Sequence, residues 1–451
     1  MAETLTGWGR TAPSAATVLH PDSAADVARL LGEPSARGVL PRGLGRAYGD
    51  AAQNGGGTVL DVRGLDHFTL SDDGLLRAGG GAGFDAILRE SVPRGWFLPV
   101  SPGTRYVTVG GAIAADVHGK NHHVDGALGA HVAEIVLATP LGERRLTPAD
   151  ELFHATTGGM GLTGVIVEAT IRMKRVHSSR VVVDTDRARD LDHVLALMDG
   201  GDHAYDYSVA WIDCLARGAR LGRSVLTRGR FADDGRFDYD PNVRLRVPPL
   251  VPGGLLGTAT VRAFNEAWFR KAPRERRGEV QSIPQFFHPL DGVRDWNRLY
   301  GPRGFLQYQF VVPFGAEDVL RGIVESLAAH PAPGFLAVLK RFGAEGPGHL
   351  SFPMPGWTLA IDLPAATPGL GALLDGFDER VLAAGGRLYL AKDSRARPEL
   401  LRAGYPRLAE WRAVRAQADP HAVLTSDLSR RLGLTADTAA ARLRLVSEDA
   451  A

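Results

Sequence analysis

The sequence predicts an α+β protein of two domains, and three observations support this. Short strand and helix patterns alternate over the first hundred residues, glycine is concentrated between 101 and 176, and alternating strand patterns take over after Arg175. A chain of 451 residues fits two or three domains of ordinary size, or two with one split. We therefore expect a domain boundary near residue 177.

The first part of the chain reads as short α+β units. A strand over 16–21 is followed by a helix over 24–31, which Asp22 or Ser23 can cap. Further strands are predicted over 38–41, 58–62, 75–78 and 97–99, with a helix over 84–90. A strand over 164–173 closes the glycine-rich section.

The second part begins with strands predicted over 179–184 and 208–213. Residues 231–279 read as one long irregular stretch, which is typical of a functional or disordered loop. Residues 388–432 read as helical and rich in arginine.

The composition excludes several classes of protein. Hydrophobic residues make up 44%, charged residues 23%, and the net charge of +1 favours neither nucleic acid nor an acidic partner. The one cysteine, Cys214, cannot form an internal disulfide, and we interpret it as a small buried residue. Neither a secretory leader nor a membrane span is visible. We expect a cytoplasmic protein or one peripheral to the plasma membrane, with the periplasmic face left open.

Three glycine-rich segments point to a bound nucleotide. Gly159–Gly164 fits the dinucleotide motif G-x-G-x-x-G, but a helix precedes it and a strand follows, the reverse of the Rossmann order. Arg42–Asp50 is a loop of free amides with two arginines, which suits a pyrophosphate nest or, equally, a plain turn. Pro102–Thr104 with Val109–Ala114 has no counterpart in a Rossmann protein. Three such segments suit a long cofactor threaded through one domain.

These segments, in this order, resemble the FAD domain of the vanillyl-alcohol-oxidase superfamily. The resemblance implies that the first binds the pyrophosphate, the second lies along the ribityl chain and isoalloxazine, and the third completes the pocket. It implies FAD contacts from Arg42, Gly43, Leu44, Gly45, Arg46, Ala47, Tyr48, Pro102, Gly103, Thr104, Val109, Gly110, Ala112, Asn121, His122, Gly159, Gly161, Gly164, Val165 and Tyr389.

Further motifs narrow the resemblance to one family, the flavoprotein oxidase subunits of decaprenylphosphoryl-β-D-ribose 2-epimerases. The motifs are Gly7–Arg10, His118–His123, Gln285–Asp291, Phe305–Phe310 and Tyr389–Arg395. The similarity runs from about Gly7 to Leu432, and the last 19 residues look like an added tail. It implies an FAD domain from residues 1–177 and 388–451, and a substrate domain over 178–387.

The family implies a reaction, a partner and a mode of cofactor binding. The 2-hydroxyl of polyprenylphosphoryl-β-D-ribose would be oxidised to a 2-keto intermediate. A separate NAD(P)H-dependent keto-reductase would complete the epimerisation to the arabinose donor for cell-wall arabinan. FAD would be non-covalent, because Arg46 stands where covalent relatives have histidine and Cys214 lies far from the glycine segments.

Oxidation of an alcohol needs a base, a positioned carbinol carbon and stabilisation of developing charge. The resemblance makes Lys392 the base or alkoxide stabiliser, the alternative being a solvated loop lysine. It places His118 in the active site, the alternative being a structural histidine. Three histidines within 118–123 could suggest a metal, but only Asp116 and Asp125 lie nearby, so we expect none.

The family's substrate pocket maps onto Tyr48, Lys120, Trp211, Gln307, Gln309, Lys340 and Ala360. The two glutamines, two apart on a strand, share one face, although a buried pair within a sheet is the alternative. Trp211 and Trp357 suit the pocket wall or an aromatic core equally. Ala360 replaces a cysteine that familiar members carry beside the flavin, and Phe287 replaces a frequent tyrosine, so fine substrate detail can differ.

The apolar run Val247–Leu256 is followed by several cations, including Arg262, Arg270 and Lys271. Apolar surface beside cations suits a polyprenyl phosphate and an anionic membrane face, the alternative being a mobile, solvated loop. Two other functions stay open at this point. One is an alditol or sugar-lactone oxidase that passes electrons to O2. The other is a flavin-binding scaffold without turnover.

Overall fold

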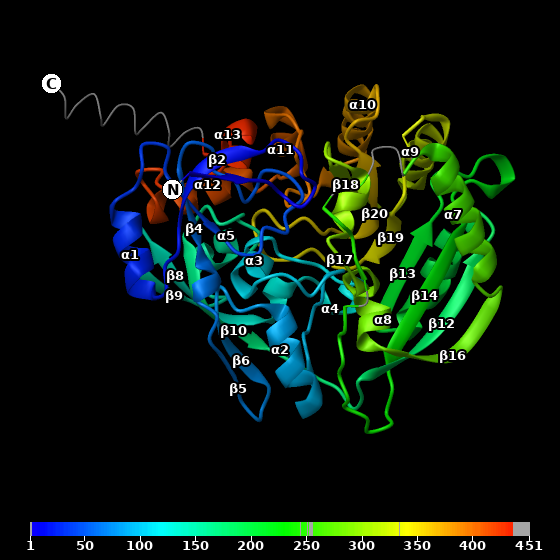
Figure 1. Ribbon diagram of the computed structural model, residues 1–451, viewed down its shortest axis with the longest axis horizontal. Coiled ribbons are helices and arrows are strands. Elements are labelled where there is room, and N and C mark those ends of the chain that lie inside the picture. The colour runs from blue at the N-terminus through cyan, green and yellow to red at the C-terminus, as the bar shows by residue number, and fades with distance from the viewer. Residues whose placement is uncertain (1, 244, 250, 252–255, 333, 436–451) are drawn as a thin grey trace.

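The computed structural model describes residues 2–243, 245–249, 251, 256–332 and 334–435. The chain folds into two halves that lie side by side (Figure 1). One half holds two small sheets and most of the blue, cyan and red elements, and the other is built around one large sheet. The predicted combination of helices and sheets in an α+β fold is confirmed.

The first half contains a four-stranded and a five-stranded sheet. The four-stranded sheet has the order β1 (Ala2–Leu5), β2 (Ser14–Leu19), β4 (Thr58–Asp61), β3 (Val39–Arg42). The five-stranded sheet is antiparallel, in the order β5 (Phe68–Leu70), β6 (Leu75–Gly79), β10 (Val165–Arg172), β8 (Val132–Thr139), β9 (Gly142–Leu146). Ser23 caps α1 (Ala24–Gly32) by accepting from the Asp26 amide at 3.1 Å, as predicted.

Short helices join these strands: α2 (Phe84–Ser91), α3 (Val109–Ala114), α4 (His122–Asp125) and α5 (Glu151–Thr156). The pair β7 (Trp96–Phe97) and β11 (Lys174–Arg175) closes this part of the chain. The order α5, glycine turn, β10 confirms that Gly159–Gly164 is not a Rossmann motif.

The end of the chain returns to this half as α11 (Pro398–Gly404), α12 (Leu408–Ala418) and α13 (Asp427–Leu432), so the helical prediction there is confirmed. Leu424 forms a parallel bridge with Val39 on β3. The buried Trp411 donates from Nε1 to the Ala155 carbonyl at 2.9 Å. Asp427, the first residue of α13, accepts from Ser14 on β2 at 2.7 Å, so both ends of the chain build one half (Figure 1).

The second half is an eight-stranded sheet in the order β16 (Glu275–Ser282), β12 (Arg180–Ala188), β14 (Ser224–Phe231), β13 (Tyr207–Ile212), β19 (Ala337–Phe342), β20 (Gly356–Pro364), β18 (Phe305–Pro313), β21 (Arg387–Leu388). One face packs on α6 (Leu191–Gly201), α9 (Glu317–Ala329) and α10 (Leu370–Ala383) through a common apolar core that includes Ala210, Leu226 and Leu339. Cys214 is buried in the same core, as expected.

The prediction of an irregular stretch over 231–279 is wrong for its second part. Residues there form α7 (Thr258–Lys271) and most of β16, while β15 (Leu245–Arg246) pairs with β17 (Val293–Arg294), and α8 (Ile283–Phe287) follows. Only Val261 and Asn265 on this helix are buried, so its apolar side chains do not pack into the core as those of an ordinary amphipathic helix do. Much of the apolar run Val247–Leu256, and the tail 436–451, lie outside the described residues.

Across the parts of the chain that are described, every helix is too short or too polar to pass through a bilayer.

Candidate active site

A cavity of about 1050 Å³ runs between the two halves. The glycine segments of the first half line one part of it, and the face of the large sheet that α6, α9 and α10 leave free lines another. Pockets for small ligands usually measure ~300–1000 Å³, so this one has room for a dinucleotide and part of a substrate.

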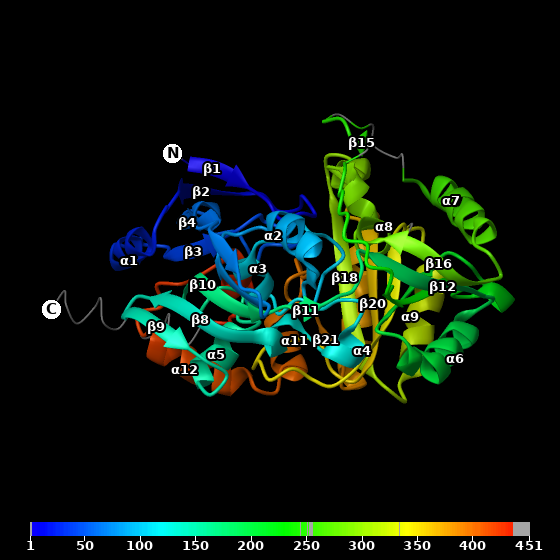
Figure 2. The same cartoon turned by 90° about the horizontal axis from the view of Figure 1, so that it is seen from below.

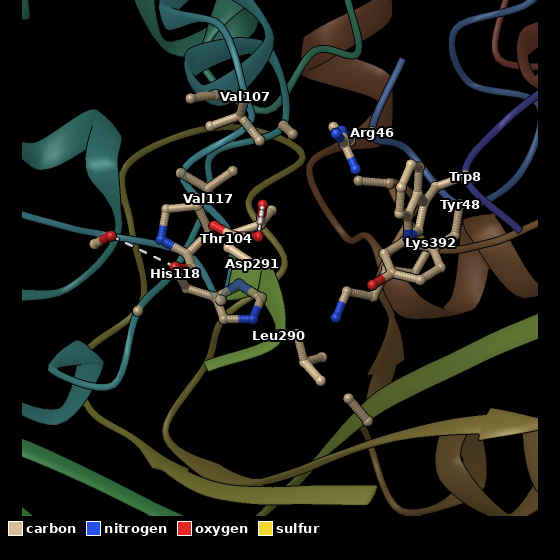
Figure 3. Close-up of a pocket in the computed structure, with 18 of the residues that line it drawn as sticks. Trp8, Arg46, Tyr48, Thr104, Val107, Val117, His118, Leu290, Asp291 and Lys392 are labelled. Atoms are coloured by element: carbon tan, nitrogen blue, oxygen red, sulfur yellow. Dashed lines mark hydrogen bonds between the residues drawn. The ribbon is translucent and has the colours of Figure 1, made fainter. Parts of the chain in front are cut away.

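The loop after β3 approaches the cavity with its backbone. Gly45 has a φ of +62°, and a Cβ atom there would lie 2.2 Å from the Arg42 guanidinium. That guanidinium donates to the carbonyls of Ala52 at 2.6 Å and Thr6 at 2.9 Å, so Arg42 shapes the loop. The Arg46 guanidinium lies 3.8 Å from the centroid of the Trp8 ring and is turned toward the cavity (Figure 3). Arg46 is thus the better placed of the two to meet an anion.

The second glycine segment packs directly against the first. A Cβ atom on Gly43 would lie 2.2 Å from Thr108 Oγ1, and Thr108 caps α3 through the Gly111 amide. On the same segment Thr104 donates to Asp291 Oδ1 at 2.7 Å, and the Arg105 amide donates to Asp291 Oδ2 at 2.8 Å. Asp291, on the loop after α8, therefore fixes this segment from the other half of the molecule.

The residues present fit FAD. Bare backbone from the three glycine segments, through Gly43, Gly110 and Gly161, lines one continuous cavity, as a long cofactor requires. Two buried polar atoms on lining residues, His118 Nδ1 and Gln307 Oε1, have no hydrogen-bond partner among the residues that the structure describes. A ligand with a polar edge would satisfy such atoms, which are otherwise costly to bury.

Lys392 lies on the turn after β21, where its amide donates to the Tyr389 carbonyl at 3.0 Å. Its side chain enters the cavity from the same side as Trp8, Arg46 and Tyr48 (Figure 3). Burial lowers the pKa of Lys392, and the nearby Asp362 carboxylate opposes this shift. A lysine with a lowered pKa can be neutral near neutral pH and accept a proton.

Asp362 is fully buried on β20, and two side chains hydrogen-bond to its carboxylate. It accepts from the side chain of Gln307 and from Tyr300 Oη at 3.3 Å. Burial raises the pKa of this carboxyl, while Gln307 and Lys392 lower it. Sequence reasoning does not single out Asp362, because a lone carboxylate on a strand is usually exposed.

His118 enters from the opposite side of the view in Figure 3. Its Nε2 lies 3.0 Å from Gln309 Nε2, which also donates to Thr358 Oγ1. Burial and the charges of Lys340 and Lys392 hold the pKa of His118 well below its usual range, so the ring is neutral. Since the amide nitrogen of Gln309 donates, Nε2 of His118 accepts. The proton of the ring therefore belongs on Nδ1, which has no partner in the described part of the chain. His118 therefore offers an N–H donor.

Four lysines line the cavity: the exposed Lys271 on α7, and three less accessible ones, Lys120, Lys340 and Lys392. Burial lowers the pKa of Lys120 and of Lys340 to about 7. Lys120 donates to the Phe286 carbonyl, and none of the three forms a salt bridge within the described residues. Asp362 lies near Lys392, whereas Lys120 and Lys340 have no carboxylate partner among the described residues, so the protonated forms of these two suit an anionic ligand.

The other expected site residues divide into two groups. Those that line the cavity with the residues above are Leu44, Ala47, Pro102, Gly103, Ala112, Gly164, Val165, Tyr389, Trp211 and Ala360. Those that do not line it are Val109, Asn121, His122, Gly159 and Gln309.

Each residue of the second group has a structural place. Val109 is part of the apolar core, and Asn121 donates to the Pro99 carbonyl at 2.7 Å. His122 Nδ1 accepts from the Gly343 amide at 3.1 Å, and Gly159 turns the chain against the Ala155 carbonyl. Gln309 stands behind His118.

Two aromatic positions discussed from the sequence are also placed. Trp357 is buried and donates to Glu317 at 2.8 Å, so it belongs to the core and not to the cavity wall. Phe287 lines the cavity while its ring packs 4.8 Å from the ring centroids of both Phe97 and Tyr207.

Comparison with known proteins agrees with this geometry. An "FAD binding domain" family model matches residues 15–147. The chain is 43% identical over 449 residues to the decaprenylphosphoryl-β-D-ribose oxidase of Mycolicibacterium smegmatis, covering 95% of this chain and 97% of that protein. An uncharacterized protein of Streptomyces coelicolor is 42% identical over 76% of this chain and 97% of its own length. The alditol oxidase of a Streptomyces species is 27% identical over 39% of this chain and 43% of its own length.

Proposed function

The chain belongs to the family of decaprenylphosphoryl-β-D-ribose oxidases, FAD-dependent oxidoreductases, and on that premise we propose that it oxidises the 2-hydroxyl of a polyprenylphosphoryl-β-D-ribose to the 2-keto sugar. The observation that carries the proposal is that a single cavity joins the glycine segments, Lys392, His118 and the two further lysines Lys120 and Lys340. The alternative function, that of an alditol oxidase, has weaker support, because the similarity to the Streptomyces alditol oxidase covers less than half of either chain.

The residues of the cavity can divide the reaction among them. Burial lowers the pKa of Lys392 to about 8, so a fraction of this lysine is neutral at neutral pH and can take the proton of the sugar hydroxyl. The His118 Nδ1–H donor, held by Gln309, orients an oxygen of the sugar or the cofactor. Lys120 and Lys340 bind the phosphate. When bound, FAD supplies the acceptor for the hydride.

We assign FAD to the three glycine segments and Arg46, and expect it to be bound non-covalently. The cofactor domain would comprise residues 1–177 and 388–451, and the substrate domain residues 178–387. An NAD(P)H-dependent keto-reductase would finish the epimerisation, giving an arabinose donor for cell-wall arabinan. The substrate is a lipid, so contact with a membrane surface is part of the proposal.

The test is the visible spectrum of the purified protein before and after anaerobic addition of farnesylphosphoryl-β-D-ribose. We expect an oxidised flavin spectrum that bleaches with this compound, and release of free FAD on denaturation. Lys392→Ala should keep the spectrum and lose rapid bleaching. Lys174→Ala, at a lysine paired with Asp125 outside the cavity lining, is the matched control.

Two results would contradict the proposal. A flavin that bleaches with free alditols or sugar lactones, and stays oxidised with the prenylphosphoryl ribose, would point to another oxidase of the superfamily. A protein that binds FAD and reacts with none of these compounds would be a scaffold.

A further inference from the structure

The cavity continues past the lysines along the free face of the large sheet. Val209 and Trp211 on β13, Val225 and Thr227 on β14, and Val338 on β19 all line it. Their sequence neighbours Ala210, Leu226 and Leu339 point the other way, into the core under α6 and α9. This end of the cavity is therefore mostly apolar, although the strands that build it also carry Lys340.

Helix α7 supplies the facing wall. Phe264, Trp268 and Lys271, spaced four and three residues apart on one side of the helix, line the cavity. The Phe264 and Trp268 rings stack with centroids 6.1 Å apart, and Phe264 lies 5.2 Å from the Phe335 ring. Figure 2 shows α7 on the opposite side of the sheet from α6 and α9. Sheet and helix enclose an apolar groove, which we call the α7 groove.

Polar contacts on another side of the helix hold α7 in place. Asn265 donates from Nδ2 to Asp213 Oδ1 at 2.7 Å, and Glu266 pairs with Arg223 at 2.6 Å. The aromatic side is left unpacked, since Phe264 and Trp268 are each 44% exposed. Large aromatic groups kept this open, on a helix fixed by other residues, form a preformed apolar surface that a ligand can cover.

The distribution of charged and apolar side chains along the cavity indicates which kind of ligand fits it. One part has Lys120, Lys340 and Lys392, none of which forms a salt bridge among the residues that the structure describes, and the other has Trp211, Phe264 and Phe335 among other apolar side chains. A molecule that satisfies both ends has an anionic head and an apolar chain.

We propose that the α7 groove binds the first isoprene units of the substrate's lipid chain, with the phosphate between the lysines and the aromatic pair. This inference rests on the proposed function and adds to it the place of the chain. Phe264 and Trp268 are then binding residues for the lipid and take no part in oxidation.

The test compares two substrates on the holoenzyme, farnesylphosphoryl-β-D-ribose and the same sugar phosphate carrying a methyl group. Phe264→Ser and Trp268→Ser should raise KM for the farnesyl substrate by about tenfold, since each removes an apolar surface from the chain. Neither variant should change kcat, or KM for the methyl substrate. The matched control is Phe314→Ser, which alters an aromatic residue that is 39% exposed and does not line the cavity.

A second measurement does not depend on turnover. Farnesyl phosphate should bind the holoenzyme more tightly than inorganic phosphate in calorimetry, and both groove variants should lose that advantage. If wild type and variants bind farnesyl phosphate equally, the inference is overturned. If no prenylphosphoryl ribose bleaches the flavin, the proposed function fails, while the farnesyl phosphate result still decides whether the groove binds a chain.

A third experiment distinguishes two ligands for the aromatic residues of α7, the surface of a membrane and the lipid chain of the substrate. Flotation with anionic phospholipid vesicles would show whether Phe264 and Trp268 dock on a bilayer. Variants that lose vesicle binding, and keep the wild-type KM for the farnesyl substrate in the absence of vesicles, would overturn the inference in favour of membrane docking.

Discussion

Replacing Lys340 by methionine should stabilise the protein at the expense of its activity. Burial, with Lys392 and Lys120 adding to it, lowers the pKa of Lys340 from 10.5 to about 7. At ~1.4 kcal/mol per pKa unit, this shift corresponds to a destabilisation of about 5 kcal/mol, an upper bound for an empty site. Methionine keeps the apolar stem and removes the charge, so the variant should recover part of this free energy.

The pH dependence gives the sharper form of the prediction. Between pH 7 and 10.5 the unfolded chain holds a proton on Lys340 that the folded chain has released, so wild-type stability rises with pH in this window. Below pH 7 both states are protonated and the destabilisation is fully present. The advantage of Lys340→Met should therefore be greatest at and below pH 7. It should shrink by about 1.4 kcal/mol for each pH unit above 7.

The assay is denaturant unfolding of the wild type and of Lys340→Met with excess FAD. The measurements are made at about pH 6.5, 7.5 and 8.5, on both sides of the folded-state pKa of Lys340. Lys174→Met is the control, because Lys174 is paired with Asp125 at 3.0 Å and its removal should bring no gain at any pH. A Lys340→Met protein no more stable than wild type at neutral pH, or a gain independent of pH, would refute the reasoning.

Three further predictions follow from the cavity. Lys392→Ala should lower kcat/KM about a hundredfold or more, and Lys392→Arg should be as slow because a guanidinium cannot accept a proton, as steady-state kinetics at constant FAD content would show. A thiol-reactive probe that enters the cavity should leave the wild type unmodified, since Cys214 is buried, and should add once to Ala360→Cys in intact-protein mass spectrometry. Gly45→Ala, at a φ of +62° and against the fixed Arg42 guanidinium, should reduce the flavin-to-protein ratio of the purified protein, whereas an unchanged ratio would exclude the loop from cofactor binding.

Functional positions are easiest to predict from the sequence where the backbone conformation or a close contact admits only one residue type. Gly43 and Gly45 are detectable because a side chain there would collide with Thr108 or Arg42, and such positions leave a glycine pattern. Lys392 and Lys120 stood out through the family motifs and the small number of lysines.

Long-range pairing limits what the sequence can predict. Nothing in it indicates that Gln309 stands behind His118, since the two residues are 191 positions apart. The strand alternation correctly suggests a common face for Gln307 and Gln309, but neighbouring residues decide which of them reaches the cavity. Helix α7 was missed for a related reason, because its aromatic side faces the groove and not the core.

The joining of both chain ends in one half has a consequence for synthesis on the ribosome. The loop that follows β3 is completed by residues made much later: Arg431 bonds to Asp50 at 2.7 Å, and Leu424 pairs with Val39. A growing chain thus emerges with its cofactor segments first, yet they stay without these partners until some 380 further residues have been translated. FAD capture is therefore expected as a late, post-translational step, and cells short of the vitamin precursor would accumulate complete chains that are exposed to proteases.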